Sequence, residues 1–244
     1  MERIITRDFV YPAFLTPPPS LSFSDQFAFR PTGSTTAALT FILHTVTNLL
    51  TTNPYVIVLA LDFSKAFDTV RHSKLMEKYA MLDIPDNIYN WLVEYFSGHS
   101  HSTRYHGQMS DLLQISASII QGSAIGPASY DVTASDLAAA SPGNILCKYA
   151  DDTYVIIPAQ NVDTRTAELL NIEAWARDNN LTLNTTCHRT TGYNYWTIRG
   201  TKDMKRTVSW QLAFVLPSCQ PQILTEKCAT RFSFSRLPQP ATFS

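Results

Sequence analysis

The sequence predicts an α/β (α+β) fold in which an antiparallel-centred sheet is backed by helices. Residues 55–61 form an unbroken apolar run, which is typical of a strand covered on both faces. Two further apolar segments, residues 144–149 and 153–158, flank an acidic pair, as expected for a β-hairpin. Apolar residues at helical spacing occur before, between and after these strands.

The length and composition allow a substantial core. The chain has 244 residues, of which 45% are hydrophobic. It has no long uncharged apolar run, and residues 1–8 lack the apolar stretch of a secretory signal. We therefore expect an intracellular protein, nuclear or cytoplasmic, with no membrane partner. The four cysteines show no CxxC spacing, so neither a zinc site nor a disulfide framework is indicated.

The N-terminal part is expected to change character near residue 25. Residues 1–24 contain the cluster Pro17-Pro18-Pro19, which cannot continue a helix, and we expect an extended N-terminal segment. The apolar spacing of residues 37–50 then predicts a helix with Ser34 or Thr35 as its N-cap. The strand at residues 55–61 follows directly.

Helical patterns dominate the remainder, interrupted by short strands. They are expected at residues 73–82, 85–96, 127–138 and 163–179, with partial strand alternation at 108–120 and a short strand at 181–183. Ala167, Leu170 and Ala174 are expected to form the buried face of the last helix. No periodicity persists beyond residue 186, so residues 187–244 are expected to be a divergent tail of low order, a small β-rich appendage being the alternative.

Charge divides the chain at the same place. Residues 1–186 hold 11 Lys and Arg against 18 Asp and Glu, whereas residues 187–244 hold 8 against 2. An acidic surface over residues 1–186 argues mildly against tight independent binding of a polyanion.

Three carboxylates stand where apolar strands meet turns: Asp62 after the first strand, and Asp151 and Asp152 at the hairpin tip. Two unit charges about 4 Å apart repel by roughly 4 kcal/mol at an effective dielectric of ~20, so the pair favours a divalent cation. The alternatives are solvated turn residues for the pair and a helix cap for Asp62. If the strands are neighbours, the three carboxylates converge and could hold two Mg²⁺ ions, with Mn²⁺ as a substitute.

Four segments, taken in order, resemble the reverse transcriptases of non-LTR, LINE-like retrotransposons. Asp62 to Asp68 resembles motif A, Gln121 to Pro127 motif B, and Tyr149 to Asp152 motif C. Gln26 to Pro31 resembles a fingers motif, and the match covers residues 25–186. The resemblance implies a right-hand polymerase palm with partial fingers. It also implies RNA-directed DNA polymerase activity, in which dNTPs are transferred to a primer 3′-hydroxyl on an RNA template.

The resemblance assigns roles to single residues. Asp62, Asp151 and Asp152 are the implied catalytic carboxylates, and Asp62, Asp151 and the backbone carbonyl of Phe63 the implied metal ligands. The implied nucleotide-binding residues are Phe67 as a steric gate against a ribose 2′-hydroxyl, Gln121 and Gly122 at the motif B turn, and Arg30 near the template or triphosphate. The alternatives are a core aromatic for Phe67, a loop glycine for Gly122 and a surface arginine for Arg30.

The match has two departures. No segment before Gln26 resembles the family's earlier fingers motif, and the lysine expected shortly after Leu183-Asn184 is absent. We therefore expect a domain truncated at both ends, with a change of reading frame or exon structure near residue 187. The alternative function is a catalytically inactive remnant with at most weak nucleic-acid binding. An RNA-dependent RNA polymerase is disfavoured by Phe67, since ribonucleotides need room there.

Overall fold

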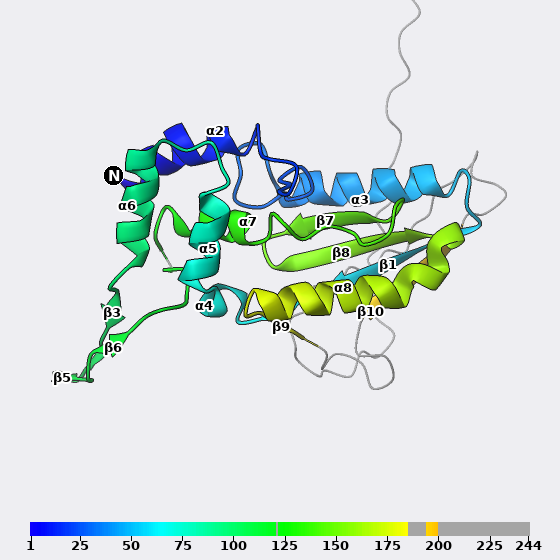
Figure 1. The fold of residues 1–244 in the computed structure, drawn as a ribbon. Coiled ribbons are helices and arrows are strands. Elements are labelled where there is room, and N and C mark those ends of the chain that lie inside the picture. Colours follow the sequence, from blue (N-terminus) through cyan, green and yellow to red (C-terminus); the bar gives the residue numbers. More distant parts are fainter. Residues whose placement is uncertain (121, 185–193, 200–244) are drawn as a thin grey trace, which may run out of the picture. The chain divides into compact units, whose positions relative to one another are not determined.

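A computed structural model describes residues 1–120, 122–184 and 194–199. They belong to one unit, Met1–Gly200. Its centre is a four-stranded antiparallel sheet in the order β10-β1-β8-β7 (Figure 1). The strands are β1 (Tyr55–Leu61), β7 (Ile145–Tyr149), β8 (Asp152–Pro158) and β10 (Asn194–Arg199). The predicted central strand and hairpin are thereby confirmed.

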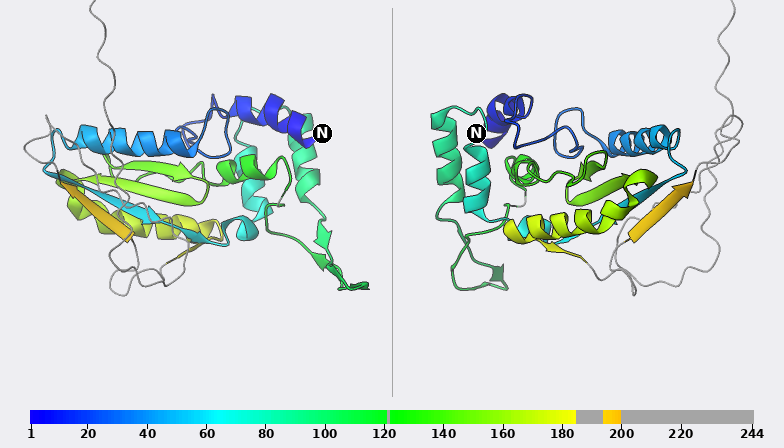
Figure 2. Two further views of the ribbon diagram at one scale, coloured as in Figure 1. Left: turned by 180° about the vertical axis from the view of Figure 1, so that it is seen from behind. Right: turned by 45° about the vertical axis from the view of Figure 1, so that its right-hand side comes forward.

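The sheet is buried on both faces because its apolar residues alternate between two layers. Val56 and Val58 of β1 and Ile156 of β8 pack against helix α3 (Thr35–Leu49). The residues between them pack on the opposite side, where α8 (Arg165–Asp178) lies (Figure 2). This period of two is the strand geometry that an uninterrupted apolar run allows.

The N-terminus of α3 is capped as the sequence predicts. Ser34 is extended, and its hydroxyl oxygen accepts a hydrogen bond from the N–H of Ala37 at 3.1 Å. Leu50 follows the last helical residue, so the chain can turn back into β1 within a few residues.

Further helices cover the end of the sheet that carries the acidic turn. They are α4 (Ala66–Thr69), α5 (His72–Tyr79), α6 (Asp86–Phe96) and α7 (Gly126–Thr133). Among the residues described, six short strands form three separate two-stranded sheets. The pairs are β2 (Phe63–Ser64) with β9 (Thr182–Leu183), β3 (Ser100–His101) with β6 (Leu113–Gln114), and β4 (Arg104–Tyr105) with β5 (Gln108–Met109). A 3₁₀ turn, η2 (Ala159–Thr164), leads from β8 into α8.

The N-terminal segment differs from the expectation of an extended chain. Residues 2–13 are helical, as α1 (Glu2–Ile5), the π-helical η1 (Thr6–Val10) and α2 (Tyr11–Ala13). Ile5, Val10 and Ala13 are buried in the main core. The prolines at 17–19 do prevent helix, but only beyond this stretch. Burial of one apolar face therefore outweighs the disorder expected near a chain terminus.

The predicted buried face of α8 is wrong. Leu170 is 60% exposed, and Ala167 and Ala174 are exposed too, whereas Glu168, Ile172 and Ala176 are buried. The Glu168 carboxylate accepts hydrogen bonds from the N–H groups of Ala140 and Ser141 and from the Asn144 amide, which satisfies its buried oxygens. The buried face of α8 is therefore the one that carries Glu168, Ile172 and Ala176, and the helix turns Ala167, Leu170 and Ala174 to the surface.

The C-terminal region was predicted to be of low order, and most of it lies outside the described residues. Residues 194–199 are an exception, because they form β10 along the edge of β1, with Tyr55 opposite Arg199. The expectation is corrected for these six residues only. Among the helices that the structure describes, none combines the length and apolar character needed to cross a membrane.

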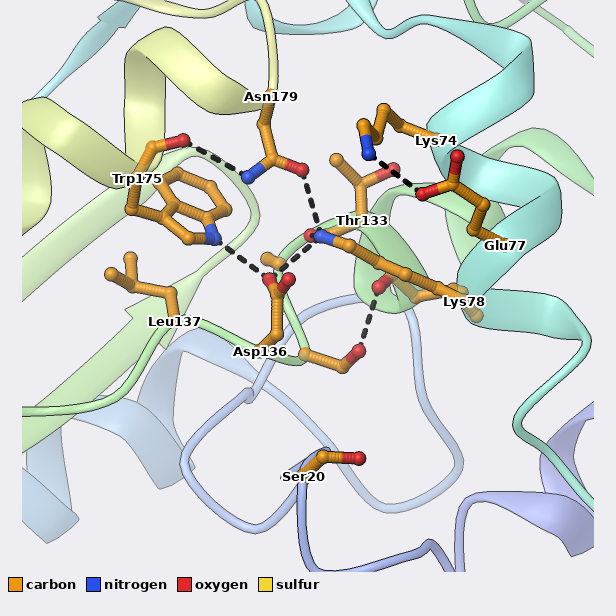
Figure 3. Close-up of polar contacts among 12 residues, drawn as sticks. Ser20, Lys74, Glu77, Lys78, Thr133, Asp136, Leu137, Trp175 and Asn179 are labelled. Carbon is orange, nitrogen blue, oxygen red and sulfur yellow. Dashed lines mark hydrogen bonds and ion pairs between the residues drawn. The ribbon is translucent and has the colours of Figure 1, made fainter.

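A buried lysine joins α5 to the C-terminal ends of α7 and α8 (Figure 3). Lys78 of α5 donates to the carbonyl of Thr133, to Asp136 Oδ1 at 2.6 Å and to Asn179 Oδ1 at 2.8 Å. The Trp175 indole N–H donates to the same Asp136 oxygen at 2.7 Å. Burial lowers the pKa of Lys78, and the neighbouring Asp136 opposes that effect. Three partners satisfy all the donors of one ammonium group.

This network predicts a measurable difference between two lysines of α5. Lys78→Met should lower the free energy of unfolding by about 2–3 kcal/mol, because three polar partners lose their donor. Lys74→Met removes an exposed lysine that pairs with Glu77, and should change stability by less than ~0.5 kcal/mol. Urea unfolding of both variants provides the measurement. Equal stability of wild type and Lys78→Met would contradict a structural role for the network.

Candidate active site

The strand register brings the three predicted carboxylates to one end of the sheet. Leu61, the last residue of β1, pairs with Thr153 of β8, so Asp62 follows at the position next to Asp152. In the β7–β8 hairpin Tyr149 pairs with Asp152, and the two residues between them form the turn that carries Asp151. The two strands are therefore neighbours, the condition under which the sequence predicted convergence.

The carboxylates act on one another electrostatically. Burial raises the pKa of Asp152 to about 6, with further contributions from the negative charges of Asp151 and Asp62. Burial also raises the pKa of Asp151, and Asp62 adds to the effect. Within the described ranges, however, no group of three His, Cys, Asp or Glu side chains is arranged so that it could hold a metal ion. The side chains supply a concentration of negative charge rather than a closed cage.

The loops that carry the carboxylates contain residues in the left-handed region. Ala150, immediately before Asp151, has φ 55°, and Lys65, three residues after Asp62, has φ 52°. Such conformations cost non-glycine residues roughly 1–3 kcal/mol each and persist only where the surroundings hold them. Both turns therefore need support from neighbouring segments.

Asn184 supports Asp62, a role that the sequence did not reveal. Its backbone N–H donates to the Asp62 carbonyl at 2.8 Å, and its side-chain amide donates to Asp62 Oδ2 at 3.2 Å. The pairing of Phe63 with Leu183 in the β2–β9 ladder brings the two residues together. Only that long-range pairing gives Asn184 its importance, so no local pattern could have identified it.

Phe67 lies in an aromatic cluster near the carboxylates. Its ring stacks on Tyr130 of α7, with centroids 4.5 Å apart and planes 22° apart, and the Phe29 ring lies nearly perpendicular to it, with centroids 5.9 Å apart. Burial raises the pKa of Tyr130, as do the charges of Asp151 and the other nearby aspartates. Tyr130, which is buried, was not among the residues predicted for the site, and only its stacking on Phe67 brings it there.

The remaining predicted nucleotide-binding residues have different settings. Gly122 has φ +85°, which favours glycine, and a Cβ there would meet no atom within 4 Å. Gln121 lies outside the described residues. Arg30 donates to the carbonyls of Phe23 and Gln26, so in this conformation its guanidinium holds its own loop. A nucleotide-binding role for Arg30 stays a prediction.

Curated relatives share the sequence over part of their length. The chain is 27% identical over 170 residues to the "RNA-directed DNA polymerase from mobile element jockey" of Drosophila melanogaster, covering 65% of this chain and 18% of that protein. It is 28% identical over 134 residues to the "Probable RNA-directed DNA polymerase from transposon X-element" of the same organism, covering 53% of this chain and 15% of the relative. The chain thus spans less than a fifth of either relative.

Solved structures share the fold. Telomerase from Candida albicans, in complex with the TWJ fragment of telomeric RNA, has a TM-score of 0.59 at 13% identity, covering 82% of this chain and 35% of that one. The corresponding Candida tropicalis complex has a TM-score of 0.55 at 14% identity, covering 73% of this chain and 31% of that one. These similarities confirm the predicted polymerase palm.

The family match is broader than the motifs. The pattern of the family described as "Reverse transcriptase (RNA-dependent DNA polymerase)" matches residues 10–238, whereas the four motifs predicted a match over 25–186. Together with the two mobile-element relatives, it confirms the resemblance on which the sequence prediction rested. The chain belongs to the reverse transcriptase (RNA-dependent DNA polymerase) family.

Proposed function

We propose that this chain carries the catalytic palm of an RNA-directed DNA polymerase of a non-LTR retrotransposon. The observation that carries the proposal is the β1–β8 register, which sets Asp62 beside the turn bearing Asp151 and Asp152. The proposed reaction is the transfer of a deoxynucleotide to a primer 3′-hydroxyl opposite an RNA template. RNA template, DNA primer and dNTP are accordingly the proposed partners.

We propose that the oxygen donors of this site serve two divalent ions, Mg²⁺ or alternatively Mn²⁺, with substrate and water supplying the remaining ligands. Asp62 and Asp151, with the carbonyl of Phe63, would hold the ions through oxygen ligands, and Asp152 would add negative charge beside them. An incomplete protein cage suits Mg²⁺, which commonly takes its other ligands from water and substrate phosphates. The bound ions would make the 3′-hydroxyl a better nucleophile and neutralise charge on the departing pyrophosphate.

The other residues of the site orient its reacting groups. Asn184 fixes both the carbonyl and the carboxylate of Asp62, which limits the movement of this proposed metal ligand. Tyr130 holds the Phe67 ring by stacking on it, and Phe29 contacts the same ring in a T-shaped arrangement. A ring held on two sides can exclude a ribose 2′-hydroxyl by its bulk, so we propose Phe67 as the sugar-selecting residue.

Removal of one proposed metal ligand should abolish most activity. Primer extension on an RNA template with Mg²⁺ and dNTPs should fall about 10²–10³-fold in Asp151→Asn, because charge stabilisation of the transition state is lost. Asp83→Asn alters an exposed carboxylate in the turn after α5 and should leave the rate unchanged.

The same assay decides between the two functional hypotheses. Incorporation by wild type that Asp151→Asn retains in full would refute catalysis by this site. A folded wild type that incorporates no nucleotide would instead favour the inactive remnant considered from the sequence.

The aromatic gate predicts a change in sugar selectivity. Phe67→Val should reduce the preference for dNTPs over rNTPs by roughly 10–200-fold, since the smaller side chain leaves room for the 2′-hydroxyl. Phe67→Tyr keeps the ring and serves as the matched control. Ratios of kcat/KM for matched dNTP and rNTP pairs are the measurement, and an unchanged ratio in Phe67→Val would rule out the gate.

A further inference from the structure

The segment before α3 attaches to the edge of the sheet beside the acidic turn. The N–H of Phe27 donates to the Lys148 carbonyl at 2.8 Å, and the N–H of Lys148 donates to the Asp25 carbonyl at 2.7 Å. Gln26 forms a parallel bridge with Lys148 and is only 2% exposed. Residues 25–27 therefore extend the sheet past its last strand, two residues before the left-handed turn.

The Gln26 side chain reaches the turn and forms hydrogen bonds with both the N–H and the C=O of Ala150. Its Oε1 accepts the N–H of Ala150 at 3.1 Å, and its Nε2 donates to the Ala150 carbonyl at 3.4 Å. The same oxygen accepts the N–H groups of Phe27 and Ala28, each at 3.1 Å. A primary amide offers the acceptor and the adjacent donor that such an arrangement needs.

The residue that Gln26 contacts, Ala150, has an unfavourable backbone conformation. Ala150 has φ 55°, which an L-residue adopts only under constraint, and it directly precedes Asp151. Its N–H and C=O lie in a turn that has no further strand partner, since Tyr149 and Asp152 close the ladder. A change in the Ala150 conformation would redirect the next side chain.

We propose that Gln26 is a positioning residue that clamps Ala150 in its left-handed conformation and thereby aims Asp151. The clamp consists of the pair of hydrogen bonds between the Gln26 side chain and the Ala150 backbone. Its effect on nucleotide transfer rests on the proposed function. Gln26 is thus a structural part of the active-site turn, contributed by a segment more than 120 residues away in sequence.

Amide hydrogen exchange followed by NMR tests the clamp without reference to catalysis. In Gln26→Met, which keeps the length of the side chain but removes its amide, the Ala150 amide should exchange roughly tenfold faster than in wild type. The amide of Ile157, within β8, should keep its protection. Gln26→Glu retains the acceptor and should preserve most of the Ala150 protection.

Asp25→Asn is the matched control. This substitution weakens the ion pair between Asp25 and Lys148, whose charged atoms are 3.1 Å apart. It changes no group that contacts the turn. It should lower overall stability yet leave the Ala150 exchange rate, relative to that of Ile157, unchanged. Selective loss of Ala150 protection in Gln26→Met alone supports the clamp.

Unchanged Ala150 exchange in a folded Gln26→Met protein would overturn the proposal. If that variant does not fold, wild type and Gln26→Glu decide: an unprotected Ala150 amide in wild type, or complete loss of its protection in Gln26→Glu, would overturn it, and protection in both supports it.

Primer extension then tests the consequence for the reaction. Gln26→Met should lower kcat by roughly 10–100-fold with little change in the KM for dNTP, because a misdirected carboxylate affects the reacting centre more than substrate binding. A kcat equal to that of wild type would overturn the positioning role. Failure of wild type itself to extend a primer would reject the proposed function, whereas the exchange data would still decide whether the clamp exists.

Discussion

The antiparallel pairing of β1 with β8 is the constraint on which the rest of the site depends. The register is fixed by packing, because alternate residues of both strands lie in two separate apolar layers. A slip of one residue would exchange the layers and move Asp62 out of line with Asp152. The geometry of the carboxylates is therefore a consequence of how the core is packed.

Buried polar side chains then secure the segments that the sheet cannot reach. Lys78 joins α5 to the ends of α7 and α8, Glu168 holds the loop before β7, and Lys148 donates to the carbonyls of Ala134 and Leu137. Gln26 likewise forms a hydrogen bond with the backbone of the acidic turn. In each case a side chain forms hydrogen bonds with backbone groups of a loop or helix end. The structure thus uses polar contacts chiefly to shape loops.

The elements with a strong local signal could be predicted, and those decided by distant contacts could not. The apolar runs predicted the bounds of β1 and of the hairpin closely. Ser34, one of the two predicted N-cap residues, precedes the first residue of α3. The prediction of the buried face of α8 was wrong because Glu168 is buried, where its carboxylate accepts hydrogen bonds. A pattern of apolar residues cannot indicate a buried glutamate. The N-terminal helices form for a related reason, since their burial depends on partners far along the chain.

The site shows the same division. The positions of Asp62, Asp151 and Asp152 at the ends of neighbouring strands could be predicted, because strand-to-turn transitions are visible in sequence. The residues that hold them, Asn184 and Gln26, act through contacts that span more than 100 positions, and Tyr130 matters only through its stacking on Phe67. Motifs therefore point to candidate reacting groups, whereas the contacts that position those groups become visible only in the fold.

In the proposed function, the strand register builds a metal-binding polymerase centre. A crystal structure of the protein with Mn²⁺ and a dNTP would test it most directly, since anomalous scattering locates the ions independently of any assay. We expect anomalous peaks within coordination distance, about 2.0–2.3 Å, of carboxylate oxygens from both Asp62 and Asp151. Nucleotide-bound crystals whose only Mn²⁺ peaks lie away from these two residues would contradict it.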